Sequence, residues 1–383
     1  MSTMEEEKAA AGSKVDAGIV AEPFRQEVRK YIEEKLGGVG PRFVGILANT
    51  DPAARKYAEW TGRACIKDGI RYEVRECDPE ELEARLEECN GDPEVHGVMI
   101  YYPVFGAFPS FFGGSMDDYL RDTVSIRKDV EGLSNTYRRN LYHNVRFVDE
   151  AKTKKCILPC TPLAVVKIME HVGVYDESLP VGDRLQGKTV TIINRSEIVG
   201  RPLAAMLAND GATIYSIDVD SIFVFKRGAL RKTEATPEEA VKQSDVVVTG
   251  VPSKAYKLPA SWLKEGSAII NVSTFKNVDE EDVLKVIAGH GVKRGCVLLV
   301  FVFLLSCCLS CCVGVFVFFR RDVDPGFDEV KRNIGCVFLF CCFRRRPLLI
   351  AVLLKTTRKW SMLPGLFYGS TSKRGSRSVS GLG

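Results

Sequence analysis

The chain has 383 residues, of which 27% are charged and 45% are hydrophobic, and its formal net charge is +4. This length allows two ordinary domains, and so mild a charge argues against a nucleic-acid-binding surface. The acidic start MSTMEEEKAA is unlike a signal or transit peptide, so we expect a cytoplasmic protein.

Cysteine and histidine positions predict a reduced protein without a metal site. Five of the 13 cysteines are scattered over the first 294 residues, as is typical of cytosolic enzymes, and the others lie between Cys296 and Cys342. None of the four histidines forms a pair at metal-ligand spacing, so we expect no zinc.

Helix and strand patterns alternate along the first part of the chain. The expected elements are a helix at 15–36, a strand at 42–49, a helix at 51–69 capped by Asp51 with Pro52 at its first position, a strand at 71–76, a helix at 79–89, a strand at 96–103 and a long loop at 104–118. This alternation favours βαβ units and a mainly parallel sheet.

A second α/β unit follows a boundary that we place near residues 150–162. Its expected elements are a linking helix at 161–173, strands at 189–194, 212–218, 245–250 and 268–273, a helix at 198–210 closed by Gly211, and a helix capped by Thr236 and Glu239 at capping-box spacing. We therefore predict one domain at 15–158, a nucleotide-binding domain at 159–294 and a separate tail at 295–383.

The turn INRSEIVGRP joins a predicted strand to a predicted helix. Such a turn aims backbone N–H groups and the positive end of the helix at one point, which suits a pyrophosphate. Gly200 would let the helix pack close to the sheet, and Arg195 and Ser196 could add donors. The turn lacks a complete G-x-G-x-x-G pattern, so a tight turn without a ligand remains the alternative.

Asp218 ends the strand that follows this helix. A carboxylate at this place accepts hydrogen bonds from the adenosine ribose and repels a 2′-phosphate. The neighbouring residues in SIDVDS include no Arg or Lys, so the sequence favours NAD over NADP. The alternative is an aspartate that caps a loop.

Four segments in consistent order resemble the methylenetetrahydrofolate dehydrogenase/cyclohydrolase family, and most of all its monofunctional NAD-dependent branch. They are ILANTDPAARKYA, KDVEGL, ILPCTPLAVVKIME and NRSEIVGRPLAAMLANDGAT, and the resemblance runs from about residue 15 to about residue 290. It implies two α/β domains flanking a cleft, with folate on the first and a Rossmann-like NAD-binding domain second. It also implies hydride transfer from 5,10-methylenetetrahydrofolate to NAD, a homodimer and a role in one-carbon metabolism.

The resemblance implies that this chain lacks the hydrolase residues of bifunctional members. Their Tyr-x-x-x-Lys pair corresponds here to Tyr57 and Thr61, and we expect Thr61 to face the cleft while Lys56 faces solvent. Their glutamine corresponds to Tyr101, and the aspartate that holds the pterin corresponds to Glu131. We expect Tyr57 to stack on the pterin beside Tyr101 as a wall residue, and little or no cyclohydrolase activity.

The resemblance also indicates further residues of the site. Cys160 falls on the cleft wall, either as a functional thiol or as a small apolar wall residue, and no nearby histidine would activate it. The loop after residue 249 and the segment 271–273 would pass the cofactor, or else are ordinary loops. The expected cofactor contacts are Arg195, Ser196, Gly200, Arg201, Pro202, Asp218, Val219, Gly250, Val251, Pro252, Asn271, Val272 and Ser273.

The resemblance stops near Gly295, where an apolar tail rich in Cys and Phe begins. Residues 296–319 are uncharged and long enough to span a bilayer, so one interpretation is a membrane anchor. A buried helix is a second, and translated intron or frameshifted sequence is a third, which the abrupt change in composition favours. An enzyme truncated in this way would expose a sheet edge, be poorly soluble and bind NAD weakly.

Two other functions remain open. One is a bifunctional or NADP-dependent dehydrogenase/cyclohydrolase, which Asp218 and Thr61 argue against. The other is a membrane-tethered, non-catalytic protein that binds folate or nucleotide through the same fold.

Overall fold

The computed structural model of the chain describes residues 14–287. The expectations for the acidic start and for the tail at 295–383, including the candidate anchor at 296–319, lie outside the described residues. Among residues 14–287, no helix combines the length and the apolar character needed to cross a bilayer.

The first part of the described chain is built on a three-stranded parallel sheet in the order β2-β1-β3. Its elements are α2 (Ala17–Leu36), β1 (Arg42–Leu47), α3 (Pro52–Lys67), β2 (Arg71–Glu76), a 3-10 turn (Pro79–Glu81), α4 (Leu82–Gly91), β3 (Gly97–Ile100), α5 (Met116–Thr123) and α6 (Asn135–Tyr142). The side chain of Asp51 accepts a hydrogen bond from the N–H of Ala53, which confirms the predicted cap of α3.

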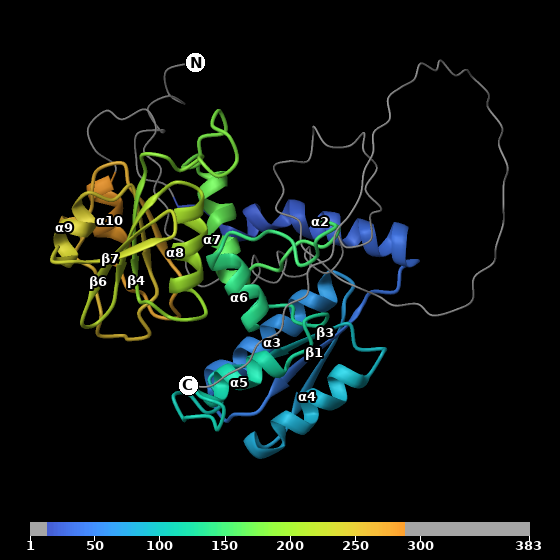
Figure 1. The fold of residues 1–383 in the computed structure, drawn as a ribbon. Coiled ribbons are helices and arrows are strands. Elements are labelled where there is room, and N and C mark those ends of the chain that lie inside the picture. The colour runs from blue at the N-terminus through green and yellow to red at the C-terminus, as the bar shows by residue number, and fades with distance from the viewer. Residues whose placement is uncertain (1–13, 288–383) are drawn as a thin grey trace, which may run out of the picture. The chain divides into compact units, whose positions relative to one another are not determined.

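Alternating side chains divide the core of this sheet into two layers. Phe43 and Leu47 of β1 pack on one face with α2 and α3, whereas Val44 and Ile46 pack on the other with α4 and α5. Figure 1 shows α3 and α4 on opposite sides of the sheet. The carboxyl ends of β1 and β3 therefore emerge beside the first turns of α3, where a site can form.

The second part of the described chain is built on a six-stranded sheet in the order β7-β6-β5-β4-β8-β9. Its elements are α7 (Cys160–His171), β4 (Thr189–Ile193), α8 (Gly200–Asn209), β5 (Thr213–Ile217), β6 (Ile222–Lys226), β7 (Ala229–Thr233), α9 (Pro237–Lys242), β8 (Val246–Thr249), a 3-10 turn (Ala260–Trp262), β9 (Ala268–Asn271) and α10 (Glu280–Ile287). The strands β5, β4, β8 and β9 are parallel, and β6 and β7 are antiparallel.

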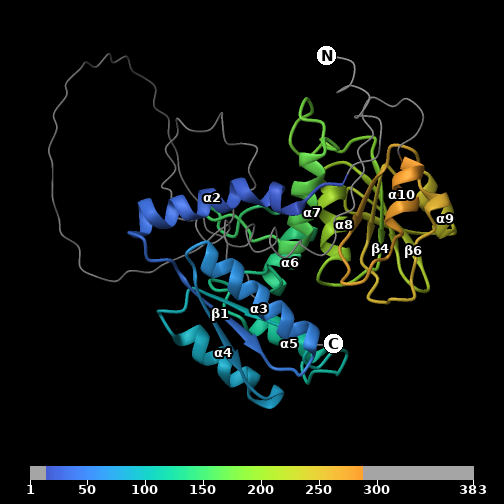
Figure 2. The same ribbon diagram turned by 180° about the vertical axis from the view of Figure 1, so that it is seen from behind.

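Helices cover both faces of this sheet. Residues of α7 and α8 form one hydrophobic core with β4 and β8, and residues of α9 and α10 belong to a core on the opposite face. Figure 2 shows α8 and α10 on opposite sides of β4. The capping box of Thr236 and Glu239 is present at the start of α9, as predicted.

Several elements were not predicted. The segment expected to be a loop to residue 118 becomes helical at Met116, and α6 (Asn135–Tyr142) and α10 (Glu280–Ile287) are further helices. The hairpin of β6 and β7 lies between Asp218 and Thr236, and its turn residues Arg227 and Gly228 both have positive φ. Positive φ at both central residues is the geometry of a tight hairpin turn.

Candidate active site

A cavity of about 460 Å³ lies where α3, the end of β3 and the start of α7 meet residues of the second sheet. Tyr57 and Trp60 come from α3, Tyr102 follows β3, and Glu131 and Cys160 lie on later segments. The residues from the second part of the chain that line the same cavity are Ile198, Val272 and Thr274. The cavity therefore joins the expected folate residues to the expected nucleotide-binding part.

Tyr57 lines the cavity as predicted, but Tyr101 does not. Tyr101 is only 1% exposed, and its ring meets the ring of Tyr57 edge-on with 5.3 Å between centroids. Because side chains alternate along β3, Tyr101 points into the core below α3, and Tyr102 forms the wall instead. The expectation that Tyr101 is a wall residue is wrong.

Thr61 is also buried rather than directed into the cavity. It is completely inaccessible to solvent, and its hydroxyl donates a hydrogen bond to the carbonyl oxygen of Tyr57 at 2.9 Å. A hydrogen bond to the carbonyl oxygen four residues earlier satisfies the hydroxyl group of a threonine inside a helix. The expectation that Thr61 faces the cleft is therefore wrong, whereas Lys56 is solvent-exposed as expected and also lines the cavity.

A pair of tyrosines fills the space beside Thr61. The hydroxyl groups of Tyr72 and Tyr101 are hydrogen-bonded to each other, and burial raises the pKa of both phenols. A Cβ at Gly45 would lie 2.4 Å from the hydroxyl of Tyr72, so only glycine leaves room for this pair. The two neutral phenols occupy the region in which the resemblance places a lysine and a glutamine.

Glu131 lines the cavity and is the carboxylate that the sequence predicted there. Desolvation, together with the nearby negative charge of Asp129, raises its pKa to about 8, against the opposing effect of Arg121. Asp129 accepts hydrogen bonds from the backbone N–H groups of Glu131, Gly132 and Ser134 at 2.9–3.0 Å. These bonds fix the loop that presents Glu131 to the cavity.

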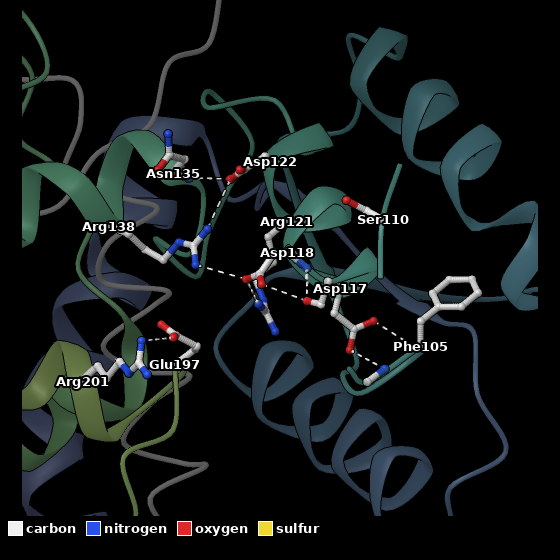
Figure 3. A network of polar contacts seen from close by, with 12 residues as sticks. Phe105, Ser110, Asp117, Asp118, Arg121, Asp122, Asn135, Arg138, Glu197 and Arg201 are labelled. Atoms are coloured by element: carbon white, nitrogen blue, oxygen red, sulfur yellow. Dashed lines mark hydrogen bonds and ion pairs between the residues drawn. The ribbon is translucent and has the colours of Figure 1, made fainter. Parts of the chain in front are cut away.

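Arg121 supports the cavity wall from behind. Its guanidinium lies 4.6 Å from the centre of the Tyr102 ring and forms an ion pair with Asp118 at 2.6 Å. Figure 3 shows Arg121 and Arg138 directed toward Asp118. The Nε atom of Arg121 is buried and makes no hydrogen bond among the described residues.

The loop after β3 is tied to the first turn of α5. The carboxylate of Asp117 accepts hydrogen bonds from the N–H groups of Val104, Phe105 and Gly106 at 2.8–3.3 Å, and part of this arrangement is visible in Figure 3. Asp117 is only 3% exposed. The side chain thus holds the backbone that follows Tyr102 in one conformation.

Cys160 lines the cavity at the start of α7, as the sequence predicted. Its Sγ atom lies 3.8 Å from the carbonyl oxygen of Val130. This contact connects α7 to the loop that carries Glu131, and it fits a wall residue that helps to shape the pocket.

The turn between β4 and α8 is tightly closed on itself. The hydroxyl oxygen of Ser196 accepts hydrogen bonds from the N–H groups of Val199 and Gly200 at 3.2 Å. A Cβ at Gly200 would lie 2.1 Å from the carbonyl oxygen of Asn194, which confirms that glycine permits the close approach of α8 to the sheet. Arg201 is exposed and pairs with Glu197 at 2.5 Å, whereas Pro202 is buried.

Arg195 binds the turn that carries Asp218. Its guanidinium donates to the hydroxyl and carbonyl oxygens of Ser216 and of Ser221 at 2.7–3.1 Å. It also lies 4.5 Å from the centre of the Phe223 ring. Arg195 therefore holds the β5–β6 turn, and its expected contact with the cofactor stays a prediction.

Asp218 is half-buried at the end of β5, where its carboxylate accepts a hydrogen bond from the N–H of the fully exposed Val219 at 2.9 Å. Burial lowers the pKa of the nearby Arg195 guanidinium, and the negative charge of Asp218 opposes this shift. No basic residue adjoins Asp218 in the sequence, so this neighbouring cation was not predicted.

Side chains of the second sheet hold its loops from within. Ser273 and Asn277 both donate to the carbonyl oxygen of Val251, and Asn277 accepts from the N–H of Val251. Asn271 accepts from the hydroxyl of Thr249 and from the N–H of Ser273. These bonds shape the loop formed by Gly250, Val251 and Pro252. Within the segment 271–273, Val272 is the residue that lines the cavity.

Sequence reasoning missed several residues that build this site. Tyr102, Arg121, Ser221 and Asn277 act through contacts with residues that are distant in the sequence. Asn277 is completely buried, and a buried amide is usually a structural hydrogen-bonding group. The two adjacent tyrosines at 101 and 102 indicated that an aromatic residue lies on the cavity wall. The alternation of side chains decides which of the two faces the cavity.

The fold and the site define an α/β protein in two parts, one with a small parallel sheet and one with a Rossmann-like sheet. Residues from both parts line one cavity, and the Rossmann-like sheet has a carboxylate at the end of β5. Residues 15–131 match the tetrahydrofolate dehydrogenase/cyclohydrolase catalytic domain, and residues 159–290 match the NAD(P)-binding domain of the same proteins. The chain belongs to the tetrahydrofolate dehydrogenase/cyclohydrolase family.

Curated relatives at 46–49% identity carry the name of the NAD-dependent enzyme. The chain is 49% identical over 274 residues to a methylenetetrahydrofolate dehydrogenase [NAD(+)] of Dictyostelium discoideum, covering 70% of this chain and 85% of the relative. It is 46% identical over 286 residues to the enzyme of the same name from Saccharomyces cerevisiae, covering 70% and 87%. The solved structure of the NAD-dependent 5,10-methylenetetrahydrofolate dehydrogenase from Saccharomyces cerevisiae matches with a TM-score of 0.71 and 41% identity, covering 80% of this chain and 97% of that one. The predicted family and fold class are confirmed.

Proposed function

We propose that this protein oxidises 5,10-methylenetetrahydrofolate to 5,10-methenyltetrahydrofolate with NAD as the hydride acceptor. The observation that carries the proposal is the cavity in which Tyr57 and Glu131 meet Val272 and Thr274, which directly follow β9 of the second sheet. A reduced pterin and a dinucleotide can meet only where their binding regions share one space. The NAD-dependent relatives support the same reaction.

The residues of the second sheet fit a dinucleotide. Gly200 lets α8 begin close to the end of β4, because a Cβ there would collide with the carbonyl oxygen of Asn194, and Asp218 places a carboxylate at the carboxyl end of β5. Asp218 would hold the ribose hydroxyls, and the loop at 250–252 would lie along the cofactor. When bound, NAD supplies the acceptor for a hydride, which leaves with both electrons of the broken C–H bond.

The residues of the first sheet orient the folate. Tyr57 would stack on the pterin, and Glu131 would accept hydrogen bonds from its ring N–H groups. The adjacent folate nitrogens stabilise the positive charge left on the carbon after hydride loss, so the step requires no protein base. The protein contributes position and a partly desolvated cavity.

We also propose that the protein lacks cyclohydrolase activity. The buried Thr61 and the neutral pair of Tyr72 and Tyr101 support this, because they offer neither an amine nor a base beside Tyr57. The two parts of the site are proposed to be domains at residues 15–158 and 159–294.

We further propose that the enzyme works in the cytoplasm as a homodimer. The five dispersed cysteines of the first 294 residues support the location. The exposed side chain of Leu230, together with Phe223 and Phe225 in a cavity of about 870 Å³, supports a second copy on the β6–β7 hairpin. Sedimentation of wild type and Leu230→Lys tests this, because a change from dimer to monomer is expected only if this face is the interface.

Purified full-length protein tests the function directly. NADH formation with 5,10-methylenetetrahydrofolate should exceed NADPH formation, and 5,10-methenyltetrahydrofolate should hydrolyse no faster than in buffer. Circular dichroism shows whether the sample is folded. A folded protein that prefers NADP, or that leaves the folate unchanged, contradicts the proposal.

A further inference from the structure

A cation and an aromatic ring lie together on the wall of the cavity. Lys56 and Trp60 are one helical turn apart on α3, and the Nζ atom of Lys56 lies 4.9 Å from the centre of the Trp60 ring. Both residues line the cavity that contains Tyr57 and Glu131. Lys56 is solvent-exposed and Trp60 is half-buried, so the pair lies toward the outer rim.

Lys56 is the single cationic side chain among the described residues that line this cavity. The other charged groups there are the carboxylates of Asp51 and Glu131. Within residues 14–287, no ion pair links Lys56 to an acidic side chain, although the neighbouring Arg55 pairs with Glu76 and Arg63 pairs with Glu59. Its positive charge therefore remains available to a ligand.

The chemistry of a reduced folate matches this arrangement, if the proposed function is correct. The molecule has a pterin at one end, an aromatic aminobenzoyl ring in the middle and a glutamate with two carboxylates at the other end. With the pterin at Glu131 and Tyr57, the rest of the molecule extends away from the interior. Trp60 offers a face to the aromatic ring, and Lys56 offers a charge to a carboxylate.

We propose that Lys56, held over Trp60, binds the glutamyl carboxylate of the folate substrate and that Trp60 packs against its aminobenzoyl ring. The pair forms a tail subsite, separate from the pterin position at Glu131. It affects substrate binding rather than the hydride transfer, because the tail lies several bonds from the reacting carbon. This inference rests on the proposed function and specifies which part of the substrate α3 recognises.

The test compares two substrates in wild type and Lys56→Gln. One is monoglutamyl 5,10-methylenetetrahydrofolate, and the other is its analogue with both glutamyl carboxylates converted to amides. With the natural substrate, Lys56→Gln should raise KM about fivefold, as expected for a partly exposed ion pair, and leave kcat unchanged. With the diamide, the two proteins should have the same KM. Added salt should reduce the difference between the substrates in wild type only.

Two further variants separate the contributions of charge and ring. Lys67→Gln removes a cation from the last turn of the same helix, outside the cavity, and should change neither KM. Trp60→Leu keeps Lys56 but removes the ring, so KM should rise for both substrates. An equal effect of Lys56→Gln on both substrates, or no effect on either, overturns the proposal.

Binding measurements keep this test distinct from that of the proposed function. Quenching of tryptophan fluorescence gives the Kd of tetrahydrofolate and of its diamide without any turnover. If wild type binds tetrahydrofolate but does not oxidise the methylene form, the proposed function fails and the Kd values still decide the role of Lys56. If wild type does not bind tetrahydrofolate, the tail subsite fails as well.

Discussion

The ring of Tyr101 lies edge-on against the ring of Tyr57, at an interplanar angle of 83° and with 5.3 Å between centroids. Tyr57 faces the cavity, whereas Tyr101 lies behind it and is hydrogen-bonded to Tyr72. The layer behind the substrate wall is therefore occupied by neutral aromatic side chains, and this determines what a single substitution can achieve there.

Thr61→Lys should not produce a hydrolase. The new ammonium group would replace a completely buried threonine, and burying a charge there is costly, so we expect a loss of about 3 kcal/mol or more in the free energy of unfolding. Urea unfolding and an assay of methenyltetrahydrofolate hydrolysis measure both effects, and Thr61→Ser is the matched control. A stable variant with clear hydrolase activity would show that the space beside Tyr57 is open.

Asp218→Ser should reduce the preference for NAD. Loss of the ribose hydrogen bonds is expected to lower kcat/KM for NAD by about 10- to 100-fold, and removal of the negative charge should raise kcat/KM for NADP. Steady-state kinetics with both cofactors test this. Asp220→Ser, two residues away and exposed, serves as the control. An unchanged preference for NAD over NADP in Asp218→Ser would mean that another group recognises the ribose.

Arg195→Lys should weaken NAD binding without changing the KM for the folate. An ammonium group cannot reproduce the forked contacts of the guanidinium with Ser216 and Ser221, so the turn carrying Asp218 should lose its fixed position. Titration calorimetry with NAD and folate kinetics at saturating NAD give the two values. If Arg195 instead bound a phosphate directly, lysine would largely replace it and the Kd would hardly change.

The stability of the protein should depend on pH through Glu131. Its pKa is about 8 in the folded protein against 4.5 for the ordinary carboxyl, so between these values the folded protein retains a proton that the unfolded chain has released. The stabilisation from Glu131 is therefore present at low pH and lost as the pH rises through about 8. Urea unfolding of wild type should show a steeper decline from about pH 6 to about pH 8 than that of Glu131→Gln.

Arg121→Met extends the same test. Removing the guanidinium takes away a charge that lowers the pKa of Glu131, so the decline in stability should continue to higher pH than in wild type. The other groups facing Glu131, namely Asp129, Tyr101 and Tyr102, are unchanged in this variant. Identical pH profiles for Arg121→Met and wild type would show that the two groups are not coupled.

Local signals in the sequence predicted the framework well. The cap at Asp51, the capping box at Thr236 and the close approach at Gly200 depend on residues within a few positions of each other, and all three were confirmed. The two sheets followed from apolar runs between helical patterns. The carboxylate of Glu131 was correctly expected in the cavity through the resemblance to known enzymes.

The remaining features depend on contacts between distant residues. Whether Tyr101 or Tyr102 faces the cavity is decided by the alternation of β3, which the sequence leaves uncertain by one residue. The contact of Arg195 with Ser221 exists because β6 pairs antiparallel with β5, so the short turn between these strands brings Ser221 back beside the end of β5. The Arg-Gly pair at 227–228 was a usable sign of the hairpin of β6 and β7, since both residues adopt positive φ in a tight turn.

The absence of a side chain at Gly45 limits which substitutions the surrounding core can accept. Any side chain at this position would collide with Tyr72 and Tyr101, and neither tyrosine can be exchanged for a smaller polar group without leaving a void in the core. Placing a lysine beside Tyr57 therefore requires several coordinated replacements instead of one, because these side chains depend on one another for their space.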